Sequence, residues 1–372
     1  MTVIFRVDAN KNIGMGHIMR CLSIADVCRL CGYKVKFILA DETVSKLIKE
    51  RGYSVNVLYS DYRNMEEELK TWPSELSGLI FVDSYFVTEA YLSCLRERVR
   101  GKLIYLDDIY AFPYQVDVVI NYNAYATPDI YNKLYSRVDF RKPKMIIGSA
   151  YAPLRTMFRG IDKKKQPDEV KNILVSTGGS DELHLQLEII RSLTASLVGD
   201  DCFYHFLLGA MNVDKEEIKR GASLNEHFII HENVTDMKSL ICSCDIAISA
   251  AGSTLYEIAS CGVPLITYSL ADNQLQGAEA FEKLGMAINI GDIRDPVSVD
   301  GSQVVSGKLD SLAVTRILMA MESLSKDKAK RSKMGEKMQQ LVDGLGADRL
   351  VREIIMIFSD DNSNEKLSGM VQ

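Results

Sequence analysis

Residues 2–39 read TVIFRVDANKNIGMGHIMRCLSIADVCRLCGYKVKFIL. Residues 2–7 form an apolar run of strand length, residues 16–31 form a mostly apolar helix that Gly32 ends, and residues 33–39 form a second strand. Short strands that are apolar on both faces and separated by helices are typical of parallel sheets covered by helices. The stretch therefore predicts an α/β fold.

The same alternation continues along the chain and is interrupted once. Residues 151–169 break it, and the polar stretch KKKQP at 163–167 contains a helix-breaking proline, which is typical of a linker. We predict two doubly wound, Rossmann-like domains facing each other across a cleft, with ligands at the C-terminal ends of the parallel strands. The predicted parts are a first domain at 1–150, a linker at 151–169, a second domain at 170–345, a helix at 346–358 and a flexible tail at 359–372.

The composition excludes several classes of protein. With 47% hydrophobic and 25% charged residues, the chain has the composition of a globular protein. A formal net charge of −6 argues against a nucleic-acid partner. The sequence has no signal-peptide pattern and no apolar run near the roughly 20 residues that span a bilayer. Its eight scattered cysteines fit packing thiols in a cytoplasmic protein, and no feature specifies an oligomeric state.

His17 is the first candidate functional residue. It lies at the start of a helix, where the positive end of the helix dipole disfavours an imidazolium, so we expect a neutral ring that accepts a proton. Gly14 and Gly16 leave room for a substrate, and Arg6 and Asp8 are expected at the same rim. Two alternatives are a histidine that only packs or caps, and a dinucleotide-binding motif, which Met19 at the third glycine position disfavours.

The second predicted domain has three polar loops after strands. Gly178 and Gly179 follow the first strand, where the alternative is a tight turn with Ser180 or Asp181 capping a helix. Ser253 and Thr254 open a later helix, and Glu257 is placed either to bind ribose hydroxyls or to complete a capping box with Thr254. The third loop contains residues 272–274, Asp-Asn-Gln. Together these loops predict a nucleoside-diphosphate site.

The motifs resemble a known family. The pattern Gly-Ser-Thr-x-x-Glu-x-x-x-x-Gly-x-Pro at 252–264, followed by the Asn-Gln loop, resembles the UDP-sugar site of GT-B enzymes of the MurG type. The N-terminal RVDA at 6–9 and IGMGHIMRCL at 13–22 resemble the PseG family, the UDP-sugar hydrolases of pseudaminic acid biosynthesis. Further similar stretches lie at 82–85, 105–108, 121–123 and 148–158, so the resemblance extends over about residues 3–357.

The resemblance implies an activity. The substrate would be UDP-2,4-diacetamido-2,4,6-trideoxy-β-L-altrose, and water would replace UDP at the anomeric carbon without a metal or other cofactor. The implied catalytic residues are His17 as general base, Tyr85 on the sugar side and Asn273 near the reacting centre. The sugar side would include Arg6, Asp8, Gly14, Gly16 and Arg155, and UDP would contact Gly178, Gly179, Ser253, Thr254, Glu257 and Gln274.

Further expectations concern the chain end and metals. In GT-B folds the last helices cross back to the N-terminal domain, and the resemblance implies the same for the helix at 346–358. No Asp-x-Asp pair is placed like a metal-diphosphate clamp, and the adjacent Asp107 and Asp108 should face opposite ways on a strand.

Two rival functions share these residues. A GT-B glycosyltransferase would use the same base and UDP site with a sugar acceptor in place of water. A non-catalytic UDP-sugar-binding protein would bind UDP without turnover.

Overall fold

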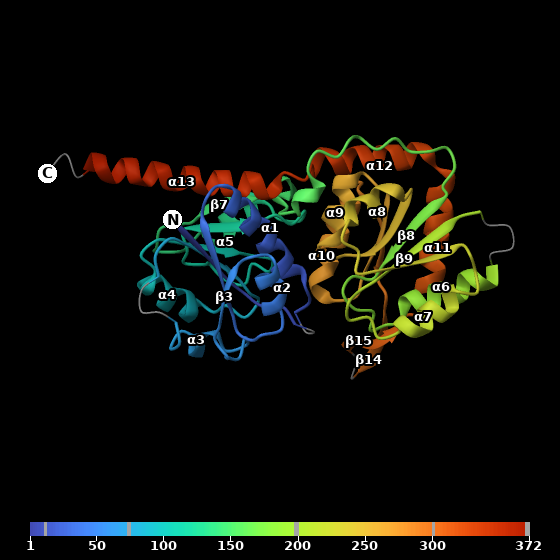
Figure 1. Cartoon of the computed structure of the whole chain (residues 1–372), viewed down its shortest axis with the longest axis horizontal. Coiled ribbons are helices and arrows are strands. Elements are labelled where there is room, and N and C mark those ends of the chain that lie inside the picture. The colour runs from blue at the N-terminus through green and yellow to red at the C-terminus, as the bar shows by residue number, and fades with distance from the viewer. Residues whose placement is uncertain (11–12, 73–75, 197–200, 300–301, 369–372) are drawn as a thin grey trace. The chain divides into compact units, whose positions relative to one another are not determined.

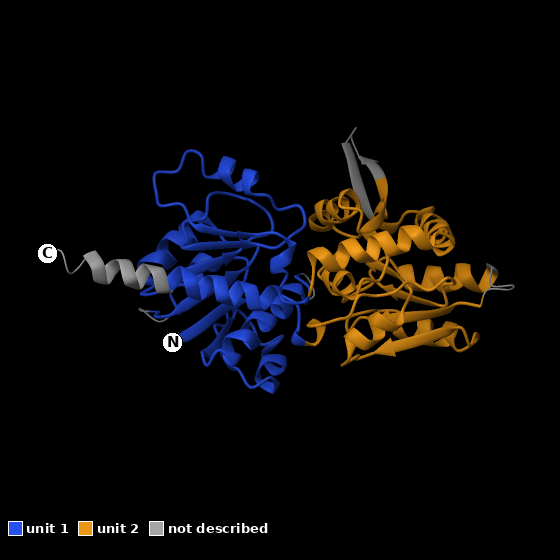
Figure 2. Cartoon of the chain, turned by 90° about the horizontal axis from the view of Figure 1, so that it is seen from above, with its two compact units in different colours: residues 1–156, 344–372 blue, residues 157–343 orange. Residues whose placement is uncertain are grey.

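The computed structural model describes residues 1–10, 13–72, 76–196, 201–299 and 302–368. The chain forms two compact units, one of residues 1–156 with 344–372 and one of residues 157–343 (Figure 2). Within the described residues, no helix is long and apolar enough to cross a membrane.

The first unit is built on a seven-stranded parallel sheet with strand order β3-β2-β1-β4-β5-β6-β7 (Figure 1). Its strands are short and largely buried on both faces, as the apolar runs predict. They are β1 Thr2–Val7, β2 Lys34–Leu39, β3 Ser54–Val57, β4 Leu79–Asp83, β5 Lys102–Leu106, β6 Val118–Asn121 and β7 Lys144–Ile147. The helices of this unit are α1 Gly16–Leu30, α2 Ser45–Glu50, α3 Met65–Glu68, α4 Glu89–Arg98, α5 Pro128–Leu134 and α13 Gly346–Ser368.

The last helix, α13, packs on α1 in the first unit (Figure 1). Its apolar residues lie in the same core as those of α1 and β1, and they are Ala347, Leu350, Val351, Ile354 and Phe358. A Cβ at Gly346, the first residue of the helix, would lie 2.1 Å from the carbonyl oxygen of Ala152. The backbone approach that brings α13 onto η1 (Ser149–Tyr151) is therefore open only to glycine.

The second unit repeats the plan on a six-stranded parallel sheet with order β10-β9-β8-β11-β12-β13. Its strands are β8 Asn172–Ser176, β9 Phe203–Leu208, β10 Phe228–Glu232, β11 Ile246–Ala250, β12 Leu265–Ser269 and β13 Ala287–Asp292. Its helices are α6 Leu185–Ser196, α7 Lys215–Ala222, α8 Met237–Ser243, α9 Thr254–Cys261, α10 Asp272–Lys283, α11 Ala313–Lys326 and α12 Lys328–Leu341. Two doubly wound α/β units are therefore present, as predicted.

One element has no counterpart in the prediction. An antiparallel pair of strands, β14 Arg294–Val299 and β15 Ser302–Leu309, follows β13 and joins neither parallel sheet. The other strands are marked by apolar runs separated by helices, whereas β14 and β15 follow each other with no helix between them.

The N-terminal end of α6 depends on a buried carboxyl group. Asp181 is 1% exposed, and its two oxygens accept the backbone N–H groups of Leu185 at 3.0 Å and Gln186 at 2.9 Å. This is the capping role that the tight-turn alternative assigned to Asp181. Burial raises the pKa of Asp181 to about 6, although the two N–H donors oppose the shift.

We predict that Asp181→Asn gains stability relative to the wild type as the pH rises from 4 to 7. A carboxyl group whose pKa is raised on folding stabilises the fold fully below its unfolded pKa and loses that contribution as the pH passes the folded pKa. Between pH 4 and pH 7, the free energy of unfolding of the variant should therefore rise by up to about 3 kcal/mol relative to that of the wild type. Urea unfolding at pH 4, 5, 6 and 7 measures it.

A matched control is Asp236, the N-cap of α8, whose pKa is lowered by hydrogen bonds from the hydroxyl and amide of Ser239. As the pH rises, the free energy of unfolding of Asp236→Asn should fall relative to that of the wild type, which is the opposite direction. A pH-independent difference for Asp181→Asn would contradict the prediction.

Candidate functional site

The candidate residues lie where the strand order of each sheet reverses. In the first sheet the chain runs from β1 through β2 to β3 and then returns to place β4 on the other side of β1. In the second sheet the chain runs from β8 through β9 to β10 and then returns to place β11 on the other side of β8. Loops diverge at such a point and leave a crevice at the C-terminal ends of the strands, where ligands of open α/β sheets bind.

His17 lies at the reversal point of the first sheet. The loop after β1 is closed by a hydrogen bond from the amide of Gly14 to the carbonyl of Asn10 (2.7 Å), and Gly14 has a φ of 78°. The helix α1 then begins at Gly16, with His17 in its first turn and no side-chain cap. The loop geometry thus places the imidazole beside the end of β4, the neighbour of β1.

Asp83, the last residue of β4, is the partner of this imidazole. The Nδ1 atom of His17 lies 2.5 Å from Oδ1 of Asp83. The carboxylate also accepts Nε of Arg20 at 2.6 Å and Nη2 of Arg20 at 2.5 Å, a bidentate pair. Burial alone would raise the pKa of Asp83, but the charge of Arg20 and the hydrogen bonds from Arg20 and His17 outweigh burial and hold this pKa well below its usual range.

Arg20 joins a second carboxylate to the cluster. Its Nη1 donates to Oδ1 of Asp108 at 2.9 Å and to the hydroxyl of Tyr122 at 3.2 Å, and Asn123 donates to the same Asp108 oxygen at 2.7 Å. Burial would raise the pKa of Asp108, but the Arg20 charge lowers it. Two ionised carboxylates therefore flank one guanidinium group.

Tyr85 lies against the ring of His17. The two ring centroids are 4.5 Å apart and the planes meet at 85°, an edge-to-face contact. The prediction that Tyr85 lies on the same side as His17 is consistent with this contact.

The second ring nitrogen of His17 has a different environment. The residue as a whole is 5% exposed. Within the described residues Nε2 makes no hydrogen bond, and it is not among the fully buried polar atoms that lack a partner. Polar groups therefore surround Nδ1, while Nε2 has no hydrogen-bond partner among the described residues.

Arg6 and Asp8 were expected at the rim, and the placement of Arg6 is wrong. Its side chain is fully buried, with Nε donating to Glu68 at 2.7 Å, Nη2 to Glu68 at 2.6 Å, and Nη1 to Asp8. Asp8 is 5% exposed and also accepts the amide of Ala40 at 2.8 Å. The alternating pleat turns Arg6 toward α3, so the group stabilises the fold and does not face a substrate.

The remaining predicted residues of the first unit are separate from this cluster. Arg155 is half-buried beyond η1 and is not a partner of His17, Arg20 or Asp83. Asp107 and Asp108 face opposite ways, as expected, because Asp107 accepts the hydroxyls of Tyr114 and Tyr131.

The three predicted loops of the second unit do lie at one edge of one sheet. The strands β8, β11 and β12 are adjacent and in parallel register, with Ser176 beside Ser249 and Ser249 beside Thr267. Gly178 follows β8 with a φ of 84°, a conformation that favours glycine, and a Cβ there would meet no atom within 4 Å. The amide of Gly178 lies 3.4 Å from Oγ of Ser176, and the open space beside the turn leaves room for an anion.

The start of α9 excludes the capping box. The helix begins at Thr254 with Ser253 as N-cap, and no side chain caps it. A capping box needs a Glu three residues after the N-cap, and Glu257 is four residues after Ser253. Within the described residues, the amides of Ser253 and Thr254 make no backbone hydrogen bond. These amides at a helix N-terminus form a potential diphosphate contact.

The third loop is partly occupied by its own side chains. Asn273 is exposed in the first turn of α10. The side-chain oxygen of Gln274 accepts the amide of Leu270 at 2.8 Å, so this oxygen orders the loop. Asp272 forms an ion pair with Arg294 at 2.6 Å.

Two buried hydroxyls near these loops were missed at the sequence level. The Oγ1 atom of Thr177 and the Oγ atom of Ser269, at the ends of β8 and β12, have no hydrogen-bond partner. Isolated Ser and Thr residues at strand ends are too common to signal a site.

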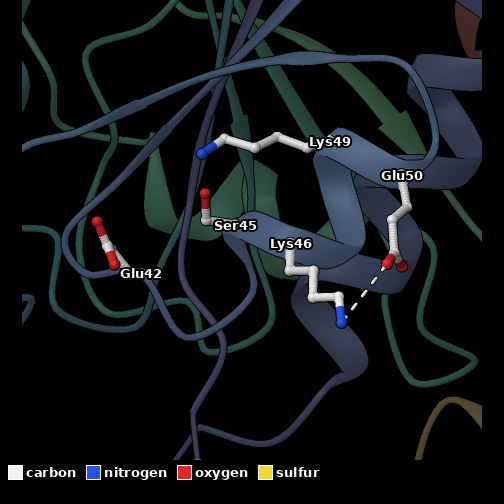
Figure 3. A pocket seen from close by; sticks show the side chains of 5 residues that line it. All are labelled: Glu42, Ser45, Lys46, Lys49 and Glu50. Atoms are coloured by element: carbon white, nitrogen blue, oxygen red, sulfur yellow. Dashed lines mark ion pairs between the residues drawn. The ribbon is translucent and has the colours of Figure 1, made fainter.

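A surface depression elsewhere has a different character. It is lined by Glu42, Ser45, Lys46, Lys49 and Glu50 around the short helix α2, and Lys46 pairs with Glu50 (Figure 3). None of the predicted site residues lines it. Within the described residues there is also no group of three or more side chains arranged to hold a metal ion.

Comparisons with known proteins agree with the two-unit architecture. Residues 172–305 match the model of the glycosyltransferase family 28 C-terminal domain. A crystal structure of MurG from Acinetobacter baumannii superposes with a TM-score of 0.60 at 14% identity, covering 96% of this chain and 100% of MurG. The chain therefore has the GT-B fold.

Curated relatives are distant in sequence. The uncharacterized protein MJ1062 of Methanocaldococcus jannaschii is 26% identical over 74% of this chain, which spans only 57% of that protein. The spore coat polysaccharide biosynthesis protein SpsG of Bacillus subtilis is 24% identical over 76% of this chain and 82% of its own length. The UDP-2,4-diacetamido-2,4,6-trideoxy-β-L-altropyranose hydrolase of Campylobacter jejuni is 27% identical over 64% of this chain and 81% of its own length. The predicted resemblance to PseG hydrolases is thus supported by sequence similarity.

Proposed function

We propose that this chain is a UDP-sugar-processing enzyme that hydrolyses UDP-2,4-diacetamido-2,4,6-trideoxy-β-L-altrose to UDP and the free sugar. The arrangement of His17 supports it most directly: Nδ1 faces Asp83, Nε2 has no hydrogen-bond partner among the described residues, and the ring lies against Tyr85. The substrate follows from the motif resemblance and from the similarity to the Campylobacter hydrolase.

In the proposed reaction, Nε2 of His17 takes a proton from water as the water oxygen attacks the anomeric carbon. The bond between that carbon and the diphosphate oxygen breaks, and its electron pair leaves with UDP. The amides after β8 and at the start of α9 would stabilise the charge that develops on the leaving group. The resemblance assigns Tyr85 to the sugar side and Asn273 to the neighbourhood of the reacting centre.

A glycosyltransferase is the second candidate, because the family 28 domain match is to a glycosyltransferase domain. It would use the same base to deprotonate an acceptor hydroxyl. Release of UDP in the absence of any acceptor separates the two reactions.

We predict that the wild type releases UDP and free sugar from a UDP-2,4-diacetamido-2,4,6-trideoxy sugar with water as the only acceptor. The variant His17→Phe should lower kcat by about 10²- to 10⁴-fold, because it keeps a planar ring but removes the base. A coupled UDP assay measures turnover. Calorimetry should find a UDP affinity within about threefold of the wild type, a difference of less than 1 kcal/mol, because the proposed UDP contacts do not include His17.

The matched control is His227→Phe. His227 lies just before β10, at the opposite end of the strand from the candidate site, and its Nδ1 lies 3.0 Å from the carbonyl oxygen of Cys202. Its turnover should equal that of the wild type. Full activity in His17→Phe would contradict the assignment, and wild-type turnover that requires an acceptor would favour the transferase.

We also predict that Gly178→Ala weakens UDP binding at least tenfold. The new methyl group would enter the open space beside the turn after β8, where the diphosphate is proposed to bind. Titration calorimetry with UDP measures the change.

Gly32→Ala provides the matched control for backbone strain. Gly32 follows α1 with a φ of 82°, and a Cβ there also meets no atom within 4 Å. Both variants should lose a similar 1–2 kcal/mol of stability, roughly the cost of a left-handed residue. Equal UDP affinity in the two variants would exclude a phosphate contact at the turn.

A further inference from the structure

We infer that Asp83 is the positioning residue that fixes the proton of His17 on Nδ1 and so leaves Nε2 as the proton acceptor. The inference rests on the proposed role of His17 as base. It identifies Asp83 as the residue that makes Nε2 of His17, and not Nδ1, the reactive ring nitrogen.

The distances around Nδ1 decide where the proton lies. Nδ1 is 2.5 Å from Oδ1 of Asp83 and 3.1 Å from Nη2 of Arg20. Two atoms with lone pairs cannot approach to 2.5 Å unless a hydrogen lies between them. An ionised carboxylate only accepts hydrogen bonds, so this hydrogen belongs to Nδ1.

Arg20 does not need Nδ1 as an acceptor. Its Nη2 has two other negatively charged partners, Oδ1 of Asp83 at 2.5 Å and Oδ2 of Asp108 at 2.8 Å. The guanidinium group instead keeps Asp83 ionised and immobile. The thiol of Cys21 donates to the remaining Asp83 oxygen at 3.3 Å, and the Asp83 side chain is fully buried.

The structure also indicates what happens without Asp83. Arg20 would keep Asp108 and Tyr122 as partners, so no unpaired buried charge would remain. Its Nη2, already 3.1 Å from Nδ1, would then donate to Nδ1. Nδ1 accepts that bond only when its own proton has moved to Nε2, and a protonated Nε2 is no base.

The test reads the tautomer of His17 directly. Protein labelled with ¹⁵N-histidine gives distinct signals for protonated and unprotonated ring nitrogens, and His17→Phe identifies the His17 signals among the five histidines. In the wild type at pH 8 we expect Nδ1 protonated and Nε2 unprotonated. In Asp83→Leu we expect the reverse.

A control and a kinetic arm accompany this measurement. Asp107→Asn changes a buried carboxylate at the same sheet edge whose partners are Tyr114 and Tyr131, so it should leave the His17 tautomer unchanged. Asp83→Leu should lower kcat about 10²- to 10⁴-fold with UDP affinity unchanged. Added to His17→Phe, it should cause no further loss, because residues that act through one another are not additive.

Each outcome bears on the inference. A wild-type His17 ring that is protonated on Nε2 and not on Nδ1 overturns the inference. This measurement uses the wild type alone, so it does not depend on the folding of any variant. An unchanged tautomer in Asp83→Leu, or a further kinetic loss in the double variant, also overturns it. If the tautomers are as expected but the wild type hydrolyses no UDP-sugar, then the positioning by Asp83 stands and the proposed reaction fails.

Discussion

The ion pair between Arg20 and Asp83 is the constraint on which the arrangement of the first unit's candidate site depends. It joins α1 to the end of β4, the two elements that border the reversal of strand order. Both side chains are buried, so removing one charge from such a pair would cost about 3–5 kcal/mol if no other partner remained. Asp108 supplies that other partner for Arg20, so one guanidinium group is shared between two carboxylates. The orientation of His17 follows from this network.

The two units use the same fold for different chemistry. In the first unit, charged side chains from α1, β4 and the loop after β5 meet at the reversal point. In the second unit the equivalent edge has glycines after β8 and, after β11, a helix N-terminus that no side chain caps. Oriented ionisable side chains are suited to proton transfer. Backbone amides bind a phosphate group without adding a titratable charge. Backbone groups of this kind provide an anion site without a basic side chain.

The sequence predicted the architecture well because the strands are short, apolar and regularly spaced, a pattern set by burial on both faces. The ribbon of β14 and β15 was missed because it lies outside both sheets. Local rules misplaced Arg6, whose partner Glu68 lies 62 residues away. The capping box, one of two alternatives for Glu257, fails because α9 begins at Thr254. The Asp83 partner of His17 is 66 residues distant, and no local pattern shows which strand-end carboxylate a helix will meet.

The return of α13 to the first unit has a consequence for the order of synthesis. The apolar face of α1 is completed by Leu350, Val351 and Ile354, which leave the ribosome only after the whole second unit has been made. Domains generally fold as units during translation, N-terminal first. Here the first unit to be translated is the last to close its core, so the nascent chain must hold that face of α1 uncovered while the second unit folds.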